Sequence, residues 1–164
     1  MSVEILPGGK IFEGQLDLMK RRVVNFAPAF AVIDTLMLAY ETRRFEQEGP
    51  GWIPLAAATI TRKASMPYQQ ILQRGEPGHT EGLKQSLTTH GPGSLFQVTP
   101  LTLTMGTSVS YAHYHQTGDG VPKRRPFPSG TDLLPSYLVW RAVLEAYLVG
   151  GEVAARTIGA TASQ

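Results

Sequence analysis

The chain of 164 residues contains no cysteine. This absence excludes disulfide bonds and thiolate catalysis, and it permits folding in a reducing compartment such as the cytoplasm. A chain of this length fits one domain, which buries roughly two thirds of its unfolded surface. We therefore expect a domain that is stable without covalent cross-links.

Long hydrophobic runs are also absent. The longest apolar stretch, Phe26 to Tyr40, is interrupted by Pro28 and Asp34. It is shorter than the ~20 residues that a membrane span needs. The first residues, Met-Ser-Val-Glu, lack the basic and then apolar order of a secretory signal. These features predict a soluble protein with no membrane partner.

Neither sign of charge predominates, because 15 Lys and Arg residues face 13 Asp and Glu residues, for a net charge of +2. Such a balance does not by itself indicate a nucleic-acid partner. Motifs of common enzymes are missing as well: the chain has no G-x-S-x-G, no H-E-x-x-H and no phosphate-binding Gly-Lys-Ser/Thr loop. We expect no enzyme activity and no cofactor.

The most specific stretch of the chain is Tyr111 to Pro128, YAHYHQTGDGVPKRRPFP. Its centre, Gly118-Asp119-Gly120 followed by Val-Pro, is not compatible with a continuous helix or a central strand. Aromatic and histidine residues precede this centre, and Lys123-Arg124-Arg125 follows it. The pattern predicts a surface loop, which is where functional residues concentrate.

The N-terminal half shows helical periodicity after a short β-like start. Residues 2–13 alternate weakly around Pro7-Gly8-Gly9, which predicts an edge strand or hairpin. Apolar residues then recur every three or four positions from Leu16 to Phe26, and again from Phe26 to Tyr40. This spacing predicts two amphipathic helices, the second beginning near Pro28.

The second half changes from a β pattern to a helical pattern. Apolar residues alternate with polar ones in three segments, 83–88, 95–98 and 101–105, which predict a three-stranded antiparallel meander. Residues 137–148 are apolar on most sides of a helix and need more than one neighbour to cover them. Residues 150–164 show no periodicity and are expected to be flexible.

Together these segments predict an α+β fold. A small antiparallel sheet, made of the three-stranded meander and an N-terminal edge strand, is expected to pack against two N-terminal helices and a C-terminal helix. Residues 1–149 are expected to form this single domain, and residues 150–164 to form a flexible C-terminal tail.

Two kinds of chemistry are compatible with the loop residues alone. His113 and His115 would point the same way on a strand, and Asp119 would add a carboxylate, although spacing fixes no third metal ligand. The cluster Lys123 to Arg125, beside aromatic residues, suits a nucleic-acid-binding module. It suits a protein interface equally well, since Tyr, Phe and Arg are enriched at hot spots.

A family resemblance favours the protein interface. The order of short motifs resembles the phage virion morphogenesis proteins, which are the tail completion proteins of tailed phages such as Mu and P2. The most specific motif is Tyr-Ala-x-x-His-Gln-x-Gly followed by Arg-Pro-Phe. The motif Trp-x-Pro-Leu, which lies upstream, supports the resemblance. The motifs are Arg44-Phe45, Trp52-x-Pro54-Leu55, Leu83-x-x-Ser86, Tyr111-Ala112-x-x-His115-Gln116-x-Gly118 and Arg125-Pro126-Phe127.

The resemblance implies a non-enzymatic virion protein at the head–tail junction, assembled in the host cytoplasm and needed for head–tail joining. It implies a ring of copies, six by resemblance, that contacts the tail tube protein and the head-closure or neck proteins. DNA would meet the ring only while passing through its lumen.

If the resemblance holds, the stretch Tyr111 to Phe127 is expected to be an assembly surface. Arg125 is expected to contact a partner, while His115 and Gln116 fix the loop through hydrogen bonds to its own backbone. Trp52 is expected to seal the end of a core. The expected interface residues are Tyr111, His115, Gln116, Lys123, Arg124, Arg125 and Phe127, and the expected structural residues are Trp52, Pro54, Leu55, Gly118 and Pro126.

Overall fold

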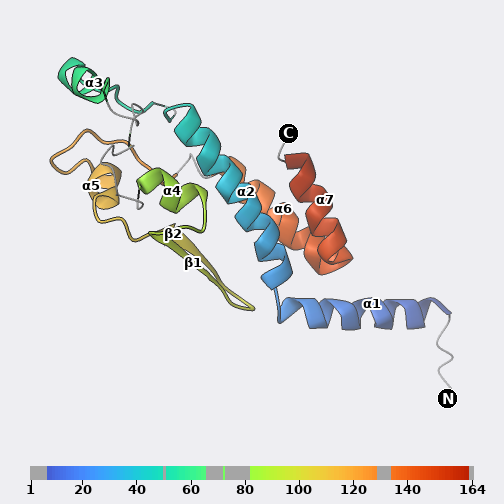
Figure 1. Ribbon diagram of the computed structural model, residues 1–164. Coiled ribbons are helices and arrows are strands. Elements are labelled where there is room, and N and C mark those ends of the chain that lie inside the picture. The colour runs from blue at the N-terminus through green and yellow to red at the C-terminus, as the bar shows by residue number, and fades with distance from the viewer. Residues whose placement is uncertain (1–6, 50, 66–71, 73–81, 129–133, 163–164) are drawn as a thin grey trace. The chain divides into compact units, whose positions relative to one another are not determined.

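The computed structural model describes residues 7–49, 51–65, 72, 82–128 and 134–162. Within these residues the fold is mostly helical, with seven helices and one two-stranded antiparallel sheet (Figure 1). The predicted α+β fold with a three-stranded meander and an N-terminal edge strand is therefore wrong. The helices are α1 (Pro7–Val23), α2 (Ala27–Glu46), α3 (Ala57–Lys63), α4 (Leu83–Thr88), α5 (Ala112–Thr117), α6 (Leu134–Gly150) and α7 (Glu152–Ala162), and the strands are β1 (Ser94–Val98) and β2 (Leu103–Thr107).

The predicted N-terminal strand is replaced by helix α1, which begins at Pro7. Proline is tolerated in the first turn of a helix because its missing N–H has no intrahelical partner there. The helical stripe that starts at Leu16 also extends back to Phe12, and this outweighs the weak alternation. Residues 2–6 of the predicted strand lie outside the described residues.

The first strand of the predicted meander is helix α4. Leu83, Ser86 and Leu87 are buried together on one face, which is the i, i+3, i+4 spacing of a helix. A spacing of four, as between Leu83 and Leu87, fits both a helix face and a strand face, so alternation alone misassigned it. The remaining strands β1 and β2 form a hairpin whose turn is closed by a 2.9 Å bond from Thr99 N–H to the Thr102 carbonyl.

The residues expected to be a flexible tail contain helix α7. Gly151, with φ of 78°, separates it from α6. Ala155 and Gly159 are its buried residues, and a Cβ at Gly159 would lie 2.5 Å from Val32 Cγ1 of α2. The fully buried residues of α7 are therefore small and leave no large apolar stripe in the sequence, although Ile158 also packs against the core formed by α2 and α6.

The chain divides into two compact units. Unit 1 comprises residues 1–36, 98–103 and 135–164, and unit 2 comprises residues 37–97 and 104–134. The division falls inside α2 and inside the hairpin. Whether residues 1–149 behave as one domain stays a prediction.

Unit 1 has its core between the first half of α2, helix α6 and helix α7. Ala29 and Ile33 of α2 are buried with Val143 and Tyr147 of α6 and with Ala155 of α7. The hydroxyl of Tyr147 also donates a 2.9 Å hydrogen bond to the carbonyl of Asn25. The polar tip of this buried tyrosine is thus satisfied where α2 begins.

Unit 2 has its core around the end of α2. Phe45 and Trp52 meet edge to face with ring centroids 5.4 Å apart, and Leu83, Leu87 and Ala112 are buried with them. Trp52 therefore occupies the core position that the sequence predicts for it.

No single helix in the described part of the chain is long and apolar enough to cross a membrane. The segments Phe12–Val23 and Ala27–Glu46 meet the length and composition requirement only as a pair, bent by 60°.

Candidate interaction site

The stretch Tyr111 to Pro128 starts as a helix and not as a loop. Helix α5 ends at Thr117 and is capped by Gly118, whose φ of 86° is left-handed and whose N–H donates 2.7 Å to the Tyr114 carbonyl. A Cβ at this position would lie 3.1 Å from Lys123 Cβ. Glycine is required here because the backbone is left-handed and the returning loop passes close by.

The loop that follows α5, from Gly118 to Pro128, is fixed to α5 by hydrogen bonds, and we call it the braced loop. The N–H of Arg124 donates 3.0 Å to the His115 carbonyl. The side-chain amide of Gln116 bonds both backbone groups of Phe127, accepting from its N–H at 3.1 Å and donating to its carbonyl at 3.3 Å. Gln116 therefore has the role expected from the sequence, since it fixes the loop through the loop's own backbone.

The carbonyl of Arg125 is the point where distant segments meet. It accepts hydrogen bonds from Arg44 Nη2 at 2.5 Å and from Trp52 Nε1 at 3.2 Å. The Arg44 guanidinium also lies 5.9 Å from the Trp52 ring centroid. The end of α2, the segment at Trp52 and the loop are thus joined at one backbone oxygen.

A second anchor is the guanidinium of Arg124. Its Nε donates 2.6 Å to the carbonyl of Ile53 and its Nη2 donates 3.1 Å to the carbonyl of Pro54. Arg124 is only 6% exposed, and burial lowers the pKa of its guanidinium. The planar fork of arginine suits such a bridge between two carbonyls. Arg124 therefore holds the Trp52-x-Pro54-Leu55 segment against the loop.

The expected interface residues separate into two groups. Lys123 and Arg125 are exposed. The others face inward, where Tyr111 accepts a 3.1 Å hydrogen bond from Leu83 N–H and Phe127 packs against the unit 2 core. Among the expected structural residues, Trp52 and Pro126 are buried, Leu55 is half-buried, and Pro54 is exposed.

The two histidines do not point the same way. The metal hypothesis assumed that His113 and His115 lie on a strand, but both lie on helix α5. In a helix, residues two positions apart point in directions about 200° apart around the axis. His115 is half-buried; burial lowers its pKa, the Pro122 carbonyl raises it, and Arg124 lowers it further. No cluster of three metal-ligating side chains occurs among the residues that the structure describes.

Glu41 is a feature that the sequence analysis missed. Its side chain is 1% exposed and neither carboxyl oxygen has a hydrogen-bond partner in the described structure. Burial raises its pKa to about 8, although Arg44 acts to lower it. Glu41 borders a small cavity of about 10 Å³ that Ser86, His90 and Phe127 also line. The sequence indicated its burial only through its position, because Glu41 follows Met37 by four residues and so lies on the same buried side of α2.

Comparisons with known proteins add no assignment to this geometry. No protein-family model, no curated protein and no solved structure matches the chain. The family resemblance therefore stays a prediction.

Proposed function

We propose that this chain is a structural virion protein of a tailed bacteriophage, a tail completion protein at the head–tail junction. Copies of it form a ring, six by resemblance, that caps the tail and is needed for head–tail joining. Its partners are the tail tube protein and the head-closure or neck proteins, and it performs no catalysis.

The observation that supports this proposal is the meeting of the motif segments at the Arg125 carbonyl. Arg44 and Trp52 both donate to that carbonyl, and Gln116 fixes the adjacent Phe127. These residues belong to four separate motifs of the resemblance. Short motifs that match a family by chance have no reason to make a single hydrogen-bonded cluster.

The cluster leaves Lys123 and Arg125 on a braced loop. Because its backbone is already fixed on both sides, the loop loses little conformational entropy when a partner binds. Arginine at a fixed position also forms planar, two-pronged contacts with carboxylates. The geometry therefore suits a permanent protein contact such as the one between a tail cap and its neighbours.

Binding of nucleic acid by Lys123 to Arg125 is less well supported. That hypothesis counts three adjacent cations, but Arg124 is committed to the carbonyls of Ile53 and Pro54. Only Lys123 and Arg125 remain exposed in this cluster, which is a small basic surface for phosphate contacts.

The test compares Arg125→Ala with Lys123→Ala in a phage whose copy of this gene carries each change. We expect Arg125→Ala to leave filled heads and separate tails in micrographs of lysates, while Lys123→Ala joins them normally. Both purified variants should melt like the parent. An equal loss of DNA affinity for both, with a salt slope reduced by about one per charge removed, would overturn the assembly proposal.

A further inference from the structure

Helix α1 carries an apolar stripe that stays exposed, uncovered by any other described part of its own chain. Every residue from 12 to 20 is exposed. Phe12, Leu16 and Met19, followed by Val23, lie on one face with exposures of 64%, 41%, 39% and 51%. Most of the stability of a helix in a protein comes from packing of its apolar face, and such a stripe is normally buried against another element.

The C-terminal end of α1 is held in a fixed direction. Arg22 Nη1 donates to the carbonyls of Leu148 and Val149, at 3.0 and 2.6 Å, at the end of α6. The N–H of Asn25 then donates 3.0 Å to the Arg22 carbonyl, and the next helix follows at a bend of 60°. Figure 1 shows α1 running away from α6 and α7. The stripe is therefore available to another molecule.

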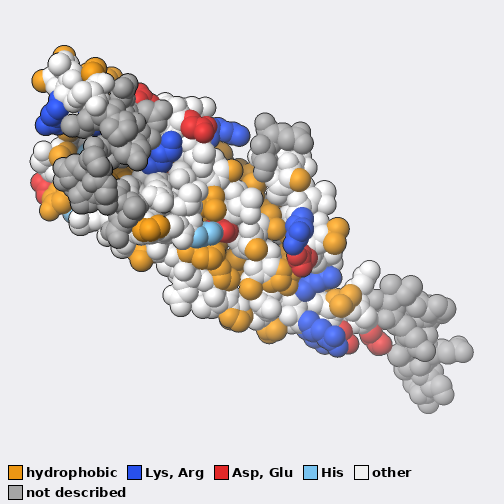
Figure 2. Space-filling model, viewed as in Figure 1, with side chains coloured by type: hydrophobic (Ala, Val, Ile, Leu, Met, Phe, Trp, Pro, Cys, Tyr) orange, Lys and Arg blue, Asp and Glu red, His pale blue; other side chains and the backbone are white. Residues whose placement is uncertain are grey.

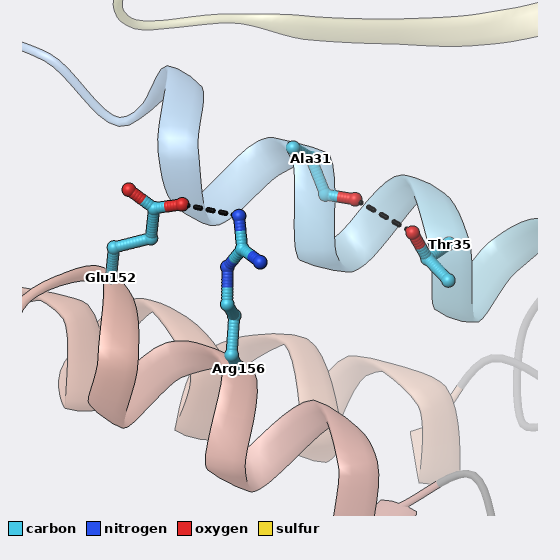
Figure 3. A network of polar contacts seen from close by, with 4 residues as sticks. All are labelled: Ala31, Thr35, Glu152 and Arg156. Atoms are coloured by element: carbon cyan, nitrogen blue, oxygen red, sulfur yellow. Dashed lines mark hydrogen bonds and ion pairs between the residues drawn. The ribbon is translucent and has the colours of Figure 1, made fainter.

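A groove of matching character lies in the same unit, between α2 and α7. It encloses about 340 Å³. The small exposed residues Ala31 and Ala160 leave room for large apolar side chains. Among the described lining residues the one hydroxyl, on Thr35, already donates 3.0 Å to the Ala31 carbonyl (Figure 3). The described lining residues are Pro28, Ala31, Val32, Thr35, Leu36, Arg156, Gly159 and Ala160.

Charges beside the stripe and beside the groove are complementary. On α1, Asp17 pairs with Lys20 at 3.3 Å. On α7, Glu152 pairs with Arg156 at 2.5 Å, and Figure 3 shows this pair over α2. Both pairs are exposed, and in both the acid precedes the base. If the two helices run antiparallel, Asp17 meets Arg156 and Lys20 meets Glu152.

We propose that α1 of one copy docks antiparallel into the α2–α7 groove of a second copy. Each subunit then offers one helix and receives one, a head-to-tail contact that closes into a ring when the rotation permits. The α1 surface has the required mixture, since hydrophobic and charged side chains both reach the surface of the molecule there (Figure 2). This inference rests on the proposed function for the ring and names the interface that builds it.

The test uses two variants that each keep their net charge and their internal ion pair. One is Asp17→Arg with Lys20→Glu, and the other is Glu152→Lys with Arg156→Glu. Circular dichroism checks that both fold. In sedimentation velocity at several concentrations, with and without tails, each variant alone should self-associate about tenfold more weakly than the parent, because two attractions become repulsions. An equimolar mixture should recover parental association, since each variant then faces a complementary neighbour.

Several results would overturn the proposal. These are parental association by either variant alone, failure of the mixture to recover, or a parent that is monomeric with and without tails. Binding of the parent to phosphatidylserine vesicles that is lost in Leu16→Asp, without self-association, would assign the stripe to a lipid surface. Rings on tails that both variants form normally would reject this interface and leave the proposed function standing. Rings that follow the expected pattern but never bind tails would support this interface and reject the proposed function.

Discussion

The braced loop of unit 2 and helix α1 of unit 1 both present basic side chains to solvent, but they differ in how they are held. The loop is tied by Arg44, Trp52, Gln116 and Arg124, all through backbone groups. Residues 12–20 of α1 are exposed without exception. Changes at the loop anchors should therefore affect folding first, whereas changes on α1 should affect association and leave folding intact.

The largest expected effect is at Trp52, where the loop, the end of α2 and the unit 2 core meet. Trp52→Ala should lower the free energy of unfolding by about 3 to 5 kcal/mol, because it removes a large buried ring from a packed core. Thermal melting measures this loss, and Tyr137→Ala, an exposed aromatic in unit 1, is the control that should melt like the parent. A Trp52 variant that melts normally but fails to bind tails would place the residue in an interface instead.

The next effect is a pH dependence of the free energy of unfolding that arises from the buried carboxyl group of Glu41. The pKa of Glu41 rises from its usual 4.5 to about 8 on folding, so between these values the folded state binds more protons than the unfolded state. The free energy of unfolding should consequently fall as pH rises through this window, by roughly 3 kcal/mol between pH 4.5 and 7. The groups around the carboxyl are Arg44 on the same helix and Ser86 and His90 across the small cavity.

Glu41→Gln should remove this pH dependence, because the amide mimics the neutral carboxyl. The exposed Glu145 in unit 1 provides the control, since Glu145→Gln should keep the parental slope. Urea unfolding at pH 5, 6, 7 and 8 distinguishes the two variants. An unchanged slope in Glu41→Gln would mean that Glu41 ionises normally in the folded state.

The smallest effect separates two neighbouring arginines. Arg124→Ala should cost about 1 to 3 kcal/mol, because it removes a buried guanidinium and its two hydrogen bonds to the carbonyls of Ile53 and Pro54. Arg125→Ala should cost less than ~1 kcal/mol, as expected for an exposed charge. Chemical denaturation of both variants is the measurement. If the order is reversed, the guanidinium of Arg125 rather than Arg124 holds the Trp52 segment.

Some of this arrangement was accessible from the sequence. The stripe from Phe26 to Tyr40 correctly indicated helix α2, and the isolated Trp52 after a glycine turn indicated a core position. The fixing of the loop by Gln116 was also expected. In each case a large side chain or a motif at a defined spacing determined the outcome.

Other parts were not accessible because they depend on tertiary contacts. Leu83 and Leu87 fit a strand as well as a helix, and α7 is buried through alanine and glycine, which give little hydrophobic signal. Among three consecutive basic residues, nothing local distinguishes Arg124 from its neighbours. The backbone direction after Gly118 decides that its side chain turns inward toward Ile53.

Electron microscopy of the purified protein, alone and mixed with tails that lack it, tests the central claim most directly. We expect closed rings of uniform size, and the same rings seated on one end of each tail. Tails that remain uncapped at saturating protein, with no ring in the free protein, would contradict it.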